Sequence, residues 1–528
     1  MRHEVMRRFP GMENPVSSGM HHVTLITRDV QANVDFYAGF LGLRLVKRTG
    51  GYEDGQQLHL FYGDENGSPG SLVTFLVWQD GAPGRVGLGQ VSEIAFAVPS
   101  ESIGDWLVRA LNQRIGAEGP SREFGEPVLR LKDPDGFIVK LVGVGDGQRT
   151  ASFGSAASAG RLRAVTILTE EPEQTAAFLG RFGYRAGPQA GNIRRLLSTT
   201  DAVDVRDATG YVPGIPGTGT ADHVAFRAAD VAAVRVAEAE LGVLNSSPTT
   251  MHDRKYFTSL YVREPGGTLF ELATDGPGFG VDEPPGHLGE TLLVPPQDAA
   301  RAEDLKVMLP QFARPGEPRL PKRDLPFVHR FYVPDEPDGS TLILLHGTGG
   351  SEADLMPLGH RVAPRATLLG MRGRAHEEGI ARWFRRLSMT VFDQADIRAE
   401  AEAFAAFMEG AVSGYGLDPA RIVFLGYSNG ANFAASVMGL HPGLIKRAIF
   451  LRSTPVLDPL PQVELTGADV LAINGSDDPF GGKAPALVAW LEDHGARVRH
   501  EVIPAGHALT DDDERIARDW LSSEERKA

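Results

Sequence analysis

Two histidines and one glutamate, far apart in the chain, are the residues of its first half that could hold a metal ion. His22 lies in the stretch HHVTL, His223 in the stretch DHVAF, and Glu271 at the end of the stretch EPGGTLFE. Two histidines and a carboxylate hold a non-haem Fe(II) ion and leave positions open for other ligands. Together these three residues predict a metal site at which a small molecule can react.

The same three stretches occur once more in this part of the chain, with different residues at the ligand positions. Their counterparts read RAVTI, SEIAF and DPDGFIVK, which place Ala164, Glu93 and Lys140 where the first set has its ligands. Lys140 would put a cation where a metal ligand is needed, so the second set cannot bind a metal in this way. We therefore expect one metal site and not two.

These stretches belong to four units of similar design between residues 20 and 275. Each unit starts with a short apolar strand, continues with a helix, and closes with strands that meet at a glycine-containing turn. The expected helices span residues 30–41, 102–113, 173–182 and 231–241. A βαβββ unit that occurs four times predicts an α+β fold, with one pair of units over residues 20–148 and a second pair over 161–275.

The second half of the chain alternates between strands and helices. Buried strands are expected at residues 341–345, 421–425, 448–451 and 470–473, and helices at 397–412 and 484–494. This alternation predicts a mostly parallel sheet with helices on both faces, in a domain that covers residues 327–528. Residues 1–19 are expected to be flexible, 149–160 to be a linker, and 276–326 to be a proline- and glycine-rich linker or arm.

Ser428 is the candidate nucleophile of the second half. It lies in the pentapeptide GYSNG between an expected strand and an expected helix, where G-x-S-x-G forms a tight turn that presents the serine hydroxyl above the sheet. The stretch HGTGG follows the first core strand. Backbone N–H groups of Thr348 in this stretch and of Asn429 would therefore form an oxyanion hole.

An acid and a base follow Ser428 in the chain order of α/β-hydrolases. The base is His507, after a late strand, and the acid is Asp478 or its neighbour Asp477. His507 would take the proton of Ser428, and the aspartate would hold the imidazole in the required tautomer. These residues predict acyl transfer on a small ester, thioester or lactone.

The first half resembles the vicinal oxygen chelate superfamily, and within it the ring-cleaving dioxygenases that act on hydroquinones. The matching stretches are residues 19–24, 59–64, 87–91 and 256–271. This resemblance implies Fe(II) or Mn(II) at His22, His223 and Glu271, with O2 as co-substrate and a small aromatic substrate.

The same resemblance implies roles for residues around the ligands. His21, Thr24, Arg254 and Tyr261 would surround the metal or line the substrate pocket. Arg254 would stabilise negative charge that develops on oxygen, or form a surface ion pair. Tyr261 would donate a proton, or pack within the sheet. Where the family usually has a second histidine this chain has Asp222, a weaker proton acceptor that can still orient a ligand.

The second half resembles the phospholipase/carboxylesterase-like α/β-hydrolases from about residue 327 to the C-terminus. The resemblance includes the stretches MRG at 371–373, WF at 383–384 and GSDDP at 475–479. The last of these matches the acid loop of that family, and it favours Asp478 over Asp477 as the third catalytic residue.

Composition limits the kinds of partner. A net charge of -15 argues against nucleic acid and anionic membranes, and an anionic substrate would need local positive charge at its site. The absence of cysteine excludes disulfides, iron–sulfur clusters, zinc–thiolate sites and a cysteine nucleophile. We see no signal peptide and no run of about 18 apolar residues, which predicts a soluble, cytoplasmic protein. A homo-oligomer is left open.

These features predict a bifunctional enzyme, an Fe(II)-dependent ring-cleaving dioxygenase fused to a serine carboxylesterase-like hydrolase. Two alternatives keep the hydrolase. In one, the first half is a glyoxalase-type isomerase or lyase whose metal acts only as a Lewis acid. In the other, it is a module that binds an aromatic compound without turnover.

Overall fold

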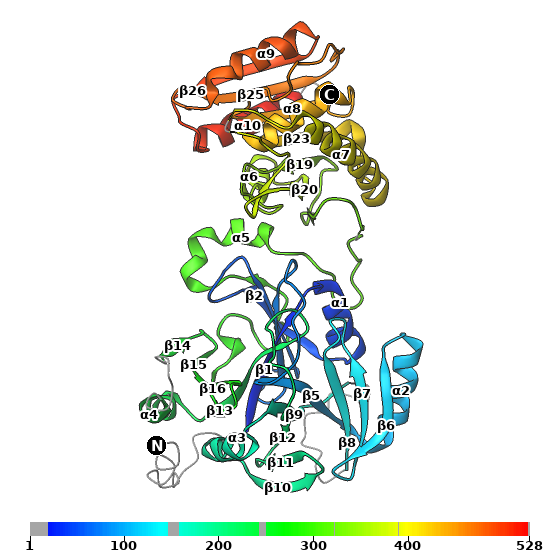
Figure 1. Ribbon diagram of the computed structural model, residues 1–528, viewed down its shortest axis with the longest axis vertical. Coiled ribbons are helices and arrows are strands. Elements are labelled where there is room, and N and C mark those ends of the chain that lie inside the picture. The colour runs from blue at the N-terminus through cyan, green and yellow to red at the C-terminus, as the bar shows by residue number, and fades with distance from the viewer. Residues whose placement is uncertain (1–18, 146–157, 242–249, 322, 389, 526–528) are drawn as a thin grey trace. The chain divides into compact units, whose positions relative to one another are not determined.

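The computed structural model describes residues 19–145, 158–241, 250–321, 323–388 and 390–525 (Figure 1). The expected flexible segment up to residue 18, and the linker as far as residue 157, lie outside the described residues. The chain forms two compact units, Met1–Ala300 with Phe312–Pro318, and Arg301–Gln311 with Arg319–Ala528. Among the described residues, no helix is long and apolar enough to cross a membrane.

The first unit contains a nine-stranded sheet with the order β14-β15-β16-β13-β1-β4-β3-β2-β17. Its strands are β1 (Met20–Thr27), β2 (Arg44–Gly50), β3 (Leu58–Gly63), β4 (Leu72–Val77), β13 (Ala221–Ala228), β14 (Met251–Asp253), β15 (Phe257–Arg263), β16 (Leu269–Pro277) and β17 (Leu292–Leu293). At the centre of the sheet β1 pairs with β13 in antiparallel fashion. The beginning and the end of this unit therefore share one sheet.

An eight-stranded sheet with the order β10-β11-β12-β9-β5-β8-β7-β6 completes the first unit. Its strands are β5 (Gln90–Pro99), β6 (Ala117–Glu123), β7 (Glu126–Lys132), β8 (Ile138–Val144), β9 (Leu162–Thr169), β10 (Arg185–Ala190), β11 (Ile193–Leu197) and β12 (Ala202–Asp207). Its two central strands, β5 and β9, are again antiparallel. Each sheet thus joins one βαβββ repeat from residues 20–148 with one βαβββ repeat from residues 161–275.

Among the described residues of the first unit, four α-helices accompany the strands: α1 (Val30–Val34), α2 (Ile103–Asn112), α3 (Pro172–Leu179) and α4 (Val231–Leu241). The helix expected over residues 30–41 begins with α1, capped by the Asp29 carboxylate, and continues as a π-helix over Asp35–Phe40. All three aromatic residues of this π-helix are buried. These aromatic side chains are therefore part of the core of the first unit.

Part of the proline- and glycine-rich segment after β16 packs on the first sheet, whereas residues 301–311 and 319–326 belong to the second unit. β17 pairs in parallel with β2, and Lys47 of β2 donates from Nζ to Asp282 Oδ1 at 2.7 Å. Lys47 also pairs with Glu283 and is fully buried. Because a buried ammonium needs charged partners, the two carboxylates of the arm match the lysine of the sheet.

The second unit contains a seven-stranded sheet with the order β18-β20-β19-β23-β24-β25-β26. Its strands are β18 (His329–Tyr332), β19 (Thr341–Leu345), β20 (Thr367–Met371), β23 (Ile422–Tyr427), β24 (Arg447–Leu451), β25 (Asp469–Gly475) and β26 (Arg497–Ile503). Neighbouring strands are parallel except at the edge, where β18 runs antiparallel to β20. A short hairpin of β21 (Ala375–Glu377) and β22 (Ile380–Arg382) stands apart from this sheet.

Helices cover both faces of this sheet with separate apolar cores. Buried side chains of α7 (Gln394–Tyr415), α8 (Asn429–Leu440) and α9 (Ala484–Asp493) form one core. Those of α5 (Ala302–Met308), α6 (Met356–Val362) and α10 (Asp511–Glu525) form the other. The central strands β19, β20, β23, β24 and β25 are almost entirely buried, which explains their largely apolar sequences.

Candidate functional sites

The register of three adjacent strands brings the candidate metal ligands together. In β1 and β13, His22 lies opposite Ala225, and Thr24 lies opposite His223. In β13 and β16, Ala225 lies beside Glu271. Side chains two residues apart on a strand share a face, so His22, His223 and Glu271 all point to the same side of the sheet.

Their donor atoms form a small triangle. His22 Nε2 lies 3.2 Å from His223 Nε2 and 3.1 Å from Glu271 Oε2, and His223 Nε2 lies 2.8 Å from Glu271 Oε2. Ligands that bind an ion at right angles with bonds of about 2.1 Å are themselves about 3 Å apart. The triangle therefore has the dimensions of one face of a metal coordination sphere.

The buried carboxylate of Glu271 also favours a cation between these side chains. Glu271 is fully buried; its Oε2 lies against the imidazoles of His22 and His223, and its Oε1 has no hydrogen-bond partner among the described residues. Burial alone would raise the pKa of Glu271, but His22 and His223 hold it well below the usual value. Burial likewise opposes a charge on His223, yet Glu271 and Asp222 raise its pKa to about 9. The donor set thus suits a divalent metal ion, and among the described residues it forms the one such cluster of metal-ligating side chains.

Neighbouring polar groups orient the imidazoles. Asp222 Oδ2 lies 2.7 Å from His223 Nδ1, and His21 Nδ1 lies 2.9 Å from His22 Nδ1. A partner on Nδ1 fixes the ring and leaves Nε2 directed at a metal. Thr24 Oγ1 lies 2.9 Å from His223 Nε2. Asp222 therefore makes a contact that can orient His223, as the sequence analysis considered possible.

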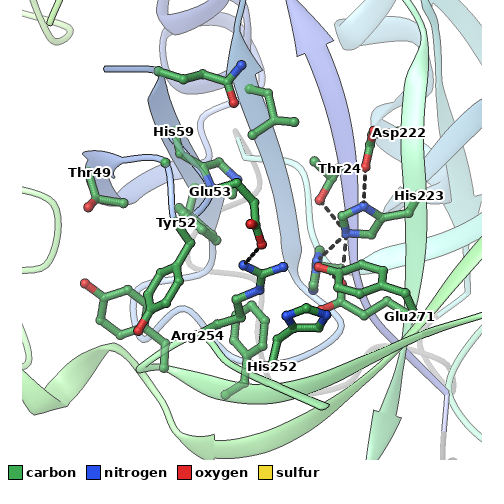
Figure 2. Close-up of a pocket in the computed structure, with 18 of the residues that line it drawn as sticks. Thr24, Thr49, Tyr52, Glu53, His59, Asp222, His223, His252, Arg254 and Glu271 are labelled. Atoms are coloured by element: carbon green, nitrogen blue, oxygen red, sulfur yellow. Dashed lines mark hydrogen bonds and ion pairs between the residues drawn. The ribbon is translucent and has the colours of Figure 1, made fainter. Parts of the chain in front are cut away.

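The candidate ligands line a cavity of about 390 Å³ in the first unit (Figure 2). Its aromatic lining residues are Tyr52, Phe61, Tyr256, Phe257 and Tyr261, and its other polar lining residues include Thr24, Glu53, His59, Asp222, His252 and Arg254. His21 is not part of this lining. It is buried behind His22 and packs against Phe257, with 5.2 Å between the ring centroids.

Arg254 lines the cavity and also forms an ion pair. Its Nη1 lies 2.5 Å from Glu53 Oε1, and its guanidinium lies 5.5 Å and 5.6 Å from the ring centroids of Tyr52 and Tyr261. Glu53 is exposed and Arg254 is mostly buried, so the pair leaves the cation on the cavity wall. Burial and the Glu271 carboxylate raise the pKa of Tyr261 well above its usual value, which keeps the phenol protonated.

Several lining residues were not predicted as site residues from the sequence, above all His252, Glu53 and Tyr52. His252 lies in β14, two residues before Arg254, and its ring centroid is 5.8 Å from that of Tyr261. Alternation along an extended segment puts residues 252 and 254 on one side. That pattern could have identified His252, whereas Glu53 and Tyr52 lie in a loop with no periodic signal.

At the positions equivalent to the candidate metal ligands of the first sheet, the second sheet has ion pairs. Ala95 pairs with both Ala164 and Lys140, as Ala225 pairs with His22 and Glu271 in the first sheet. Lys140 Nζ lies 3.0 Å from Glu93 Oε2 and 2.9 Å from Glu123 Oε2. Arg130 also binds Glu93. The cation of Lys140 thus satisfies the carboxylates that surround it.

In the second unit, Ser428 stands at the sharp turn between β23 and α8. Its φ of 51° and ψ of -114° are strained for a residue with a side chain. A Cβ at Gly430 would lie 2.1 Å from Leu345 O, and one at Gly426 would lie 2.7 Å from Ala431 Cα. Only glycine fits these two positions, which explains the spacing of the motif.

The candidate base and acid lie within hydrogen-bonding distance of this serine and of each other, respectively. His507 Nε2 lies 3.0 Å from Ser428 Oγ, and His507 Nδ1 lies 2.9 Å from Asp478 Oδ2. Asp478 is buried, whereas Asp477 is exposed. The structure therefore brings Ser428, His507 and Asp478 together and leaves Asp477 outside the group.

The predicted oxyanion region is held by the MRG and WF stretches. Asn429 is the first residue of α8, where backbone N–H groups have no partner within the helix. Its side-chain oxygen accepts from Trp383 N at 2.9 Å, and His346 O accepts from Trp383 Nε1 at 2.9 Å. Gly373 N donates to His346 Nε2 at 3.0 Å. These bonds fix the loop that carries Thr348 against the start of α8.

Comparison with known proteins identifies the family of the first half. Residues 19–141 match the family described as the Glyoxalase/Bleomycin resistance protein/Dioxygenase superfamily. MhqO of Bacillus subtilis, named as a ring-cleaving dioxygenase, is 35% identical over 286 residues, which are 53% of this chain and 91% of MhqO. The chain belongs to this superfamily. A second member, the chlorohydroquinone/hydroquinone 1,2-dioxygenase of Sphingobium indicum, is 32% identical over 314 residues, 55% of this chain and 95% of that protein.

The chain also matches a hydrolase that is separate from the superfamily members. MhqD of Bacillus subtilis, named as a hydrolase, is 36% identical over 183 residues, which are 34% of this chain and 92% of MhqD. The dioxygenase resemblance of the first half and the hydrolase resemblance of the second are both confirmed. The chain is thus similar, over different shares of its length, to two proteins that are separate chains in Bacillus subtilis.

Proposed function

We propose that the first half is an Fe(II)-dependent dioxygenase that opens the ring of hydroquinone-type diphenols, and that the second half is a serine hydrolase of small esters or acyl compounds. The observation that carries the first proposal is the triangle of His22, His223 and Glu271, open to a cavity with aromatic walls. Mn(II) is the alternative metal. The name of the Sphingobium indicum relative supports hydroquinones as the substrate class.

The donor set would hold the metal on one side of the cavity. When bound, the metal supplies open positions for a substrate hydroxyl and for O2, and it carries electrons between them. Tyr52, Tyr256 and Phe257 offer aromatic surface for a single ring and exclude water from it. The substrate is therefore held between apolar walls with one edge toward the ligands.

Charged and polar groups around the ring then act on protons and charge. Arg254 places a permanent cation on the cavity wall, where it stabilises negative charge that develops on oxygen. Tyr261 keeps its proton and donates it to an oxygen that becomes basic during ring opening. Asp222 accepts from His223 Nδ1 and so directs Nε2 toward the metal.

In the second half, His507 takes the proton of Ser428 as the hydroxyl attacks a carbonyl carbon. Asp478 holds the imidazole tautomer and stabilises its positive charge. Backbone N–H groups of Thr348 and Asn429 bind the oxygen on which negative charge accumulates. His507 then returns its proton to the leaving group, and water releases the acyl group by the same route.

Oxygen uptake tests the dioxygenase proposal. The full chain is loaded anaerobically with Fe(II) and mixed with methylhydroquinone, chlorohydroquinone or catechol, beside a His223→Ala variant. We expect uptake that requires both Fe(II) and His223. Activity on glyoxalase-type substrates with Ni(II) or Zn(II), without oxygen uptake, would favour the isomerase instead. Tight aromatic binding without turnover under any metal would favour the binding module.

A further inference from the structure

A buried guanidinium contacts the loop of the second unit that carries one part of the proposed oxyanion hole. Arg382, the last residue of β22, is only 4% exposed. Its Nη1 donates to Thr348 Oγ1 at 3.0 Å. The residues on either side of it are tied to the same region, because Ala381 O accepts from Gly349 N at 2.9 Å and Trp383 N donates to Asn429 Oδ1. Arg382 therefore stands between the two parts of the proposed oxyanion hole.

The positive charge of Arg382 is poorly compensated by the chain itself. In the described part of the protein its ion pair is with Glu377, at 3.7 Å from Nε to Oε2, which is too long for a hydrogen bond. Glu377 instead binds Arg386 at 2.7 Å. Arg382 Nε reaches only the carbonyl of Phe384, at 3.4 Å. Burial and the neighbouring Arg386 lower the pKa of Arg382.

Another buried arginine of the same unit shows what full compensation looks like. Arg452 binds both oxygens of Asp513, at 2.6 Å and 2.9 Å, and both side chains are fully buried. Its Nε and Nη2 also donate to the carbonyls of Gly506 and Ala508. A buried guanidinium is costly without such partners. The contrast shows that Arg382 has donor capacity and charge left for an anion.

We propose that Arg382 binds a carboxylate of the acyl substrate, so that the hydrolase acts on monoesters or thioesters of dicarboxylic acids. This inference rests on the proposed serine hydrolase and names its substrate class. A guanidinium suits this role because it presents paired N–H groups to a carboxylate and stays charged. In a chain with a net charge of -15, Arg382 also supplies the local cation that an anionic substrate requires.

The proposal also relates the two halves through their chemistry. When a ring bond opens beside a carbon that carries a hydroxyl, that carbon becomes a carboxyl group. An acyl product of the proposed dioxygenase would therefore contain the anionic group that Arg382 binds. The reaction class that supplies this substrate is oxidative ring opening of a diphenol. In this diphenol one carbon of the cleaved bond carries the hydroxyl group, and the other carries a leaving group.

Matched esters test the inference on the full chain. Mono(4-nitrophenyl) esters of glutaric, adipic and pimelic acid are each compared with the 4-nitrophenyl fatty ester of equal length, after subtraction of spontaneous hydrolysis. The quantity measured is the ratio of kcat/KM for the anionic ester to that for the neutral ester. We expect a ratio above ten at one chain length. Arg382→Met should lower this ratio about 10- to 100-fold, the range for loss of a charged hydrogen bond.

Two further variants separate the local effect from net charge and from misfolding. Arg382→Lys keeps the charge but not the paired N–H groups, and we expect an intermediate ratio. Arg385→Met removes an arginine of the same segment that is 61% exposed, and it should leave the ratio unchanged. A wild-type ratio at or below one at every length would overturn the inference, as would an unchanged ratio in folded Arg382→Met. If the wild type hydrolyses none of these esters, or Ser428→Ala hydrolyses them equally well, the serine hydrolase itself is wrong.

Discussion

His22 and His223, separated by 201 positions in the sequence, bring their Nε2 atoms to within 3.2 Å of each other. Their strands, β1 and β13, are neighbours at the centre of one sheet. This pairing is possible because the chain completes the second sheet before it returns to the first. The candidate metal centre therefore exists only when both ends of the first unit have folded together.

The contact between Asp222 and His223 predicts an effect on metal affinity. Asp222→Asn keeps the shape of the side chain but removes the charge that orients Nδ1. We expect the affinity for Fe(II) to fall by about 10- to 100-fold, the usual range for a residue that supports a ligand. Competition with a coloured chelator measures this affinity. His287→Ala, at an exposed histidine of the same unit, serves as the control. Equal affinities for Asp222→Asn and the wild type would contradict the orienting role.

Because Arg254 lines the cavity, we expect its replacement to lower kcat more than the loss of its ion pair with Glu53 does. Removing one donor of a charge-stabilising site costs about 10²- to 10³-fold in kcat, and we expect a loss of this size in oxygen uptake for Arg254→Met. Glu53→Gln removes the partner, which is exposed, but leaves the cation in the cavity. It should change kcat by less than about threefold, because exposed ion pairs contribute little. Losses of equal size in the two variants would show that only the ion pair matters.

The ion pairs of the second sheet predict a stability effect at Lys140. Lys140→Met leaves Glu93 buried without one of its cations, and we expect the free energy of unfolding to fall by about 3–5 kcal/mol. Lys132→Met is the matched control, because Lys132 is 57% exposed and lies 3.9 Å from Glu118. Chemical denaturation of both variants measures the difference. A loss below about 1 kcal/mol in Lys140→Met would contradict this account.

The same cluster predicts the direction of the pH dependence. Burial would raise the pKa of Glu93, but Lys140 and Arg130 lower it below the unfolded value of 4.5. A carboxyl with a lowered pKa contributes stability that is fully present above 4.5 and is lost as the pH falls through its folded value. We expect the melting temperature of the wild type to drop below pH 4.5, and to drop less steeply in Lys140→Met. Parallel curves for the two proteins would exclude Glu93 as a cause.

Two adjacent aspartates allow a sharp test of the hydrolase site. Asp478→Asn should lower kcat for ester hydrolysis about 10⁴-fold, because the imidazole of His507 then takes the wrong tautomer. Asp477→Asn changes an exposed residue outside the group and should retain most of the activity. Reversed effects of the two substitutions would assign the acid to Asp477.

The candidate ligand set could be predicted from the sequence because comparison of the repeated units revealed it. His22, His223 and Glu271 occupy positions where their counterparts are non-ligands, and strand alternation fixes their common face. The serine site was equally accessible, because Gly426 and Gly430 mark a turn that tolerates no side chain.

Long-range partners could not be predicted in this way. Lys47 appears as an ordinary strand lysine, and only the folded arm provides Asp282 and Glu283 as its partners. The π-helix that follows α1 has no signal in the apolar pattern, because it differs from an α-helix only in its hydrogen bonds. The burial of Arg382 likewise depends on a hairpin that packs against distant segments.

Labelled oxygen tests the central claim most directly. Fe(II)-loaded Ser428→Ala protein, which retains the first half intact, is given methylhydroquinone under ¹⁸O2, and the product is analysed by mass spectrometry. A dioxygenase places one ¹⁸O atom in the new carboxylate and a second in the carbonyl group formed with it, before the carbonyl exchanges with water. We expect the labelled carboxylate in a ring-opened product. A product that forms without ¹⁸O, or a substrate that stays intact while iron is bound, would contradict the assignment of His22, His223 and Glu271 to a ring-cleaving centre.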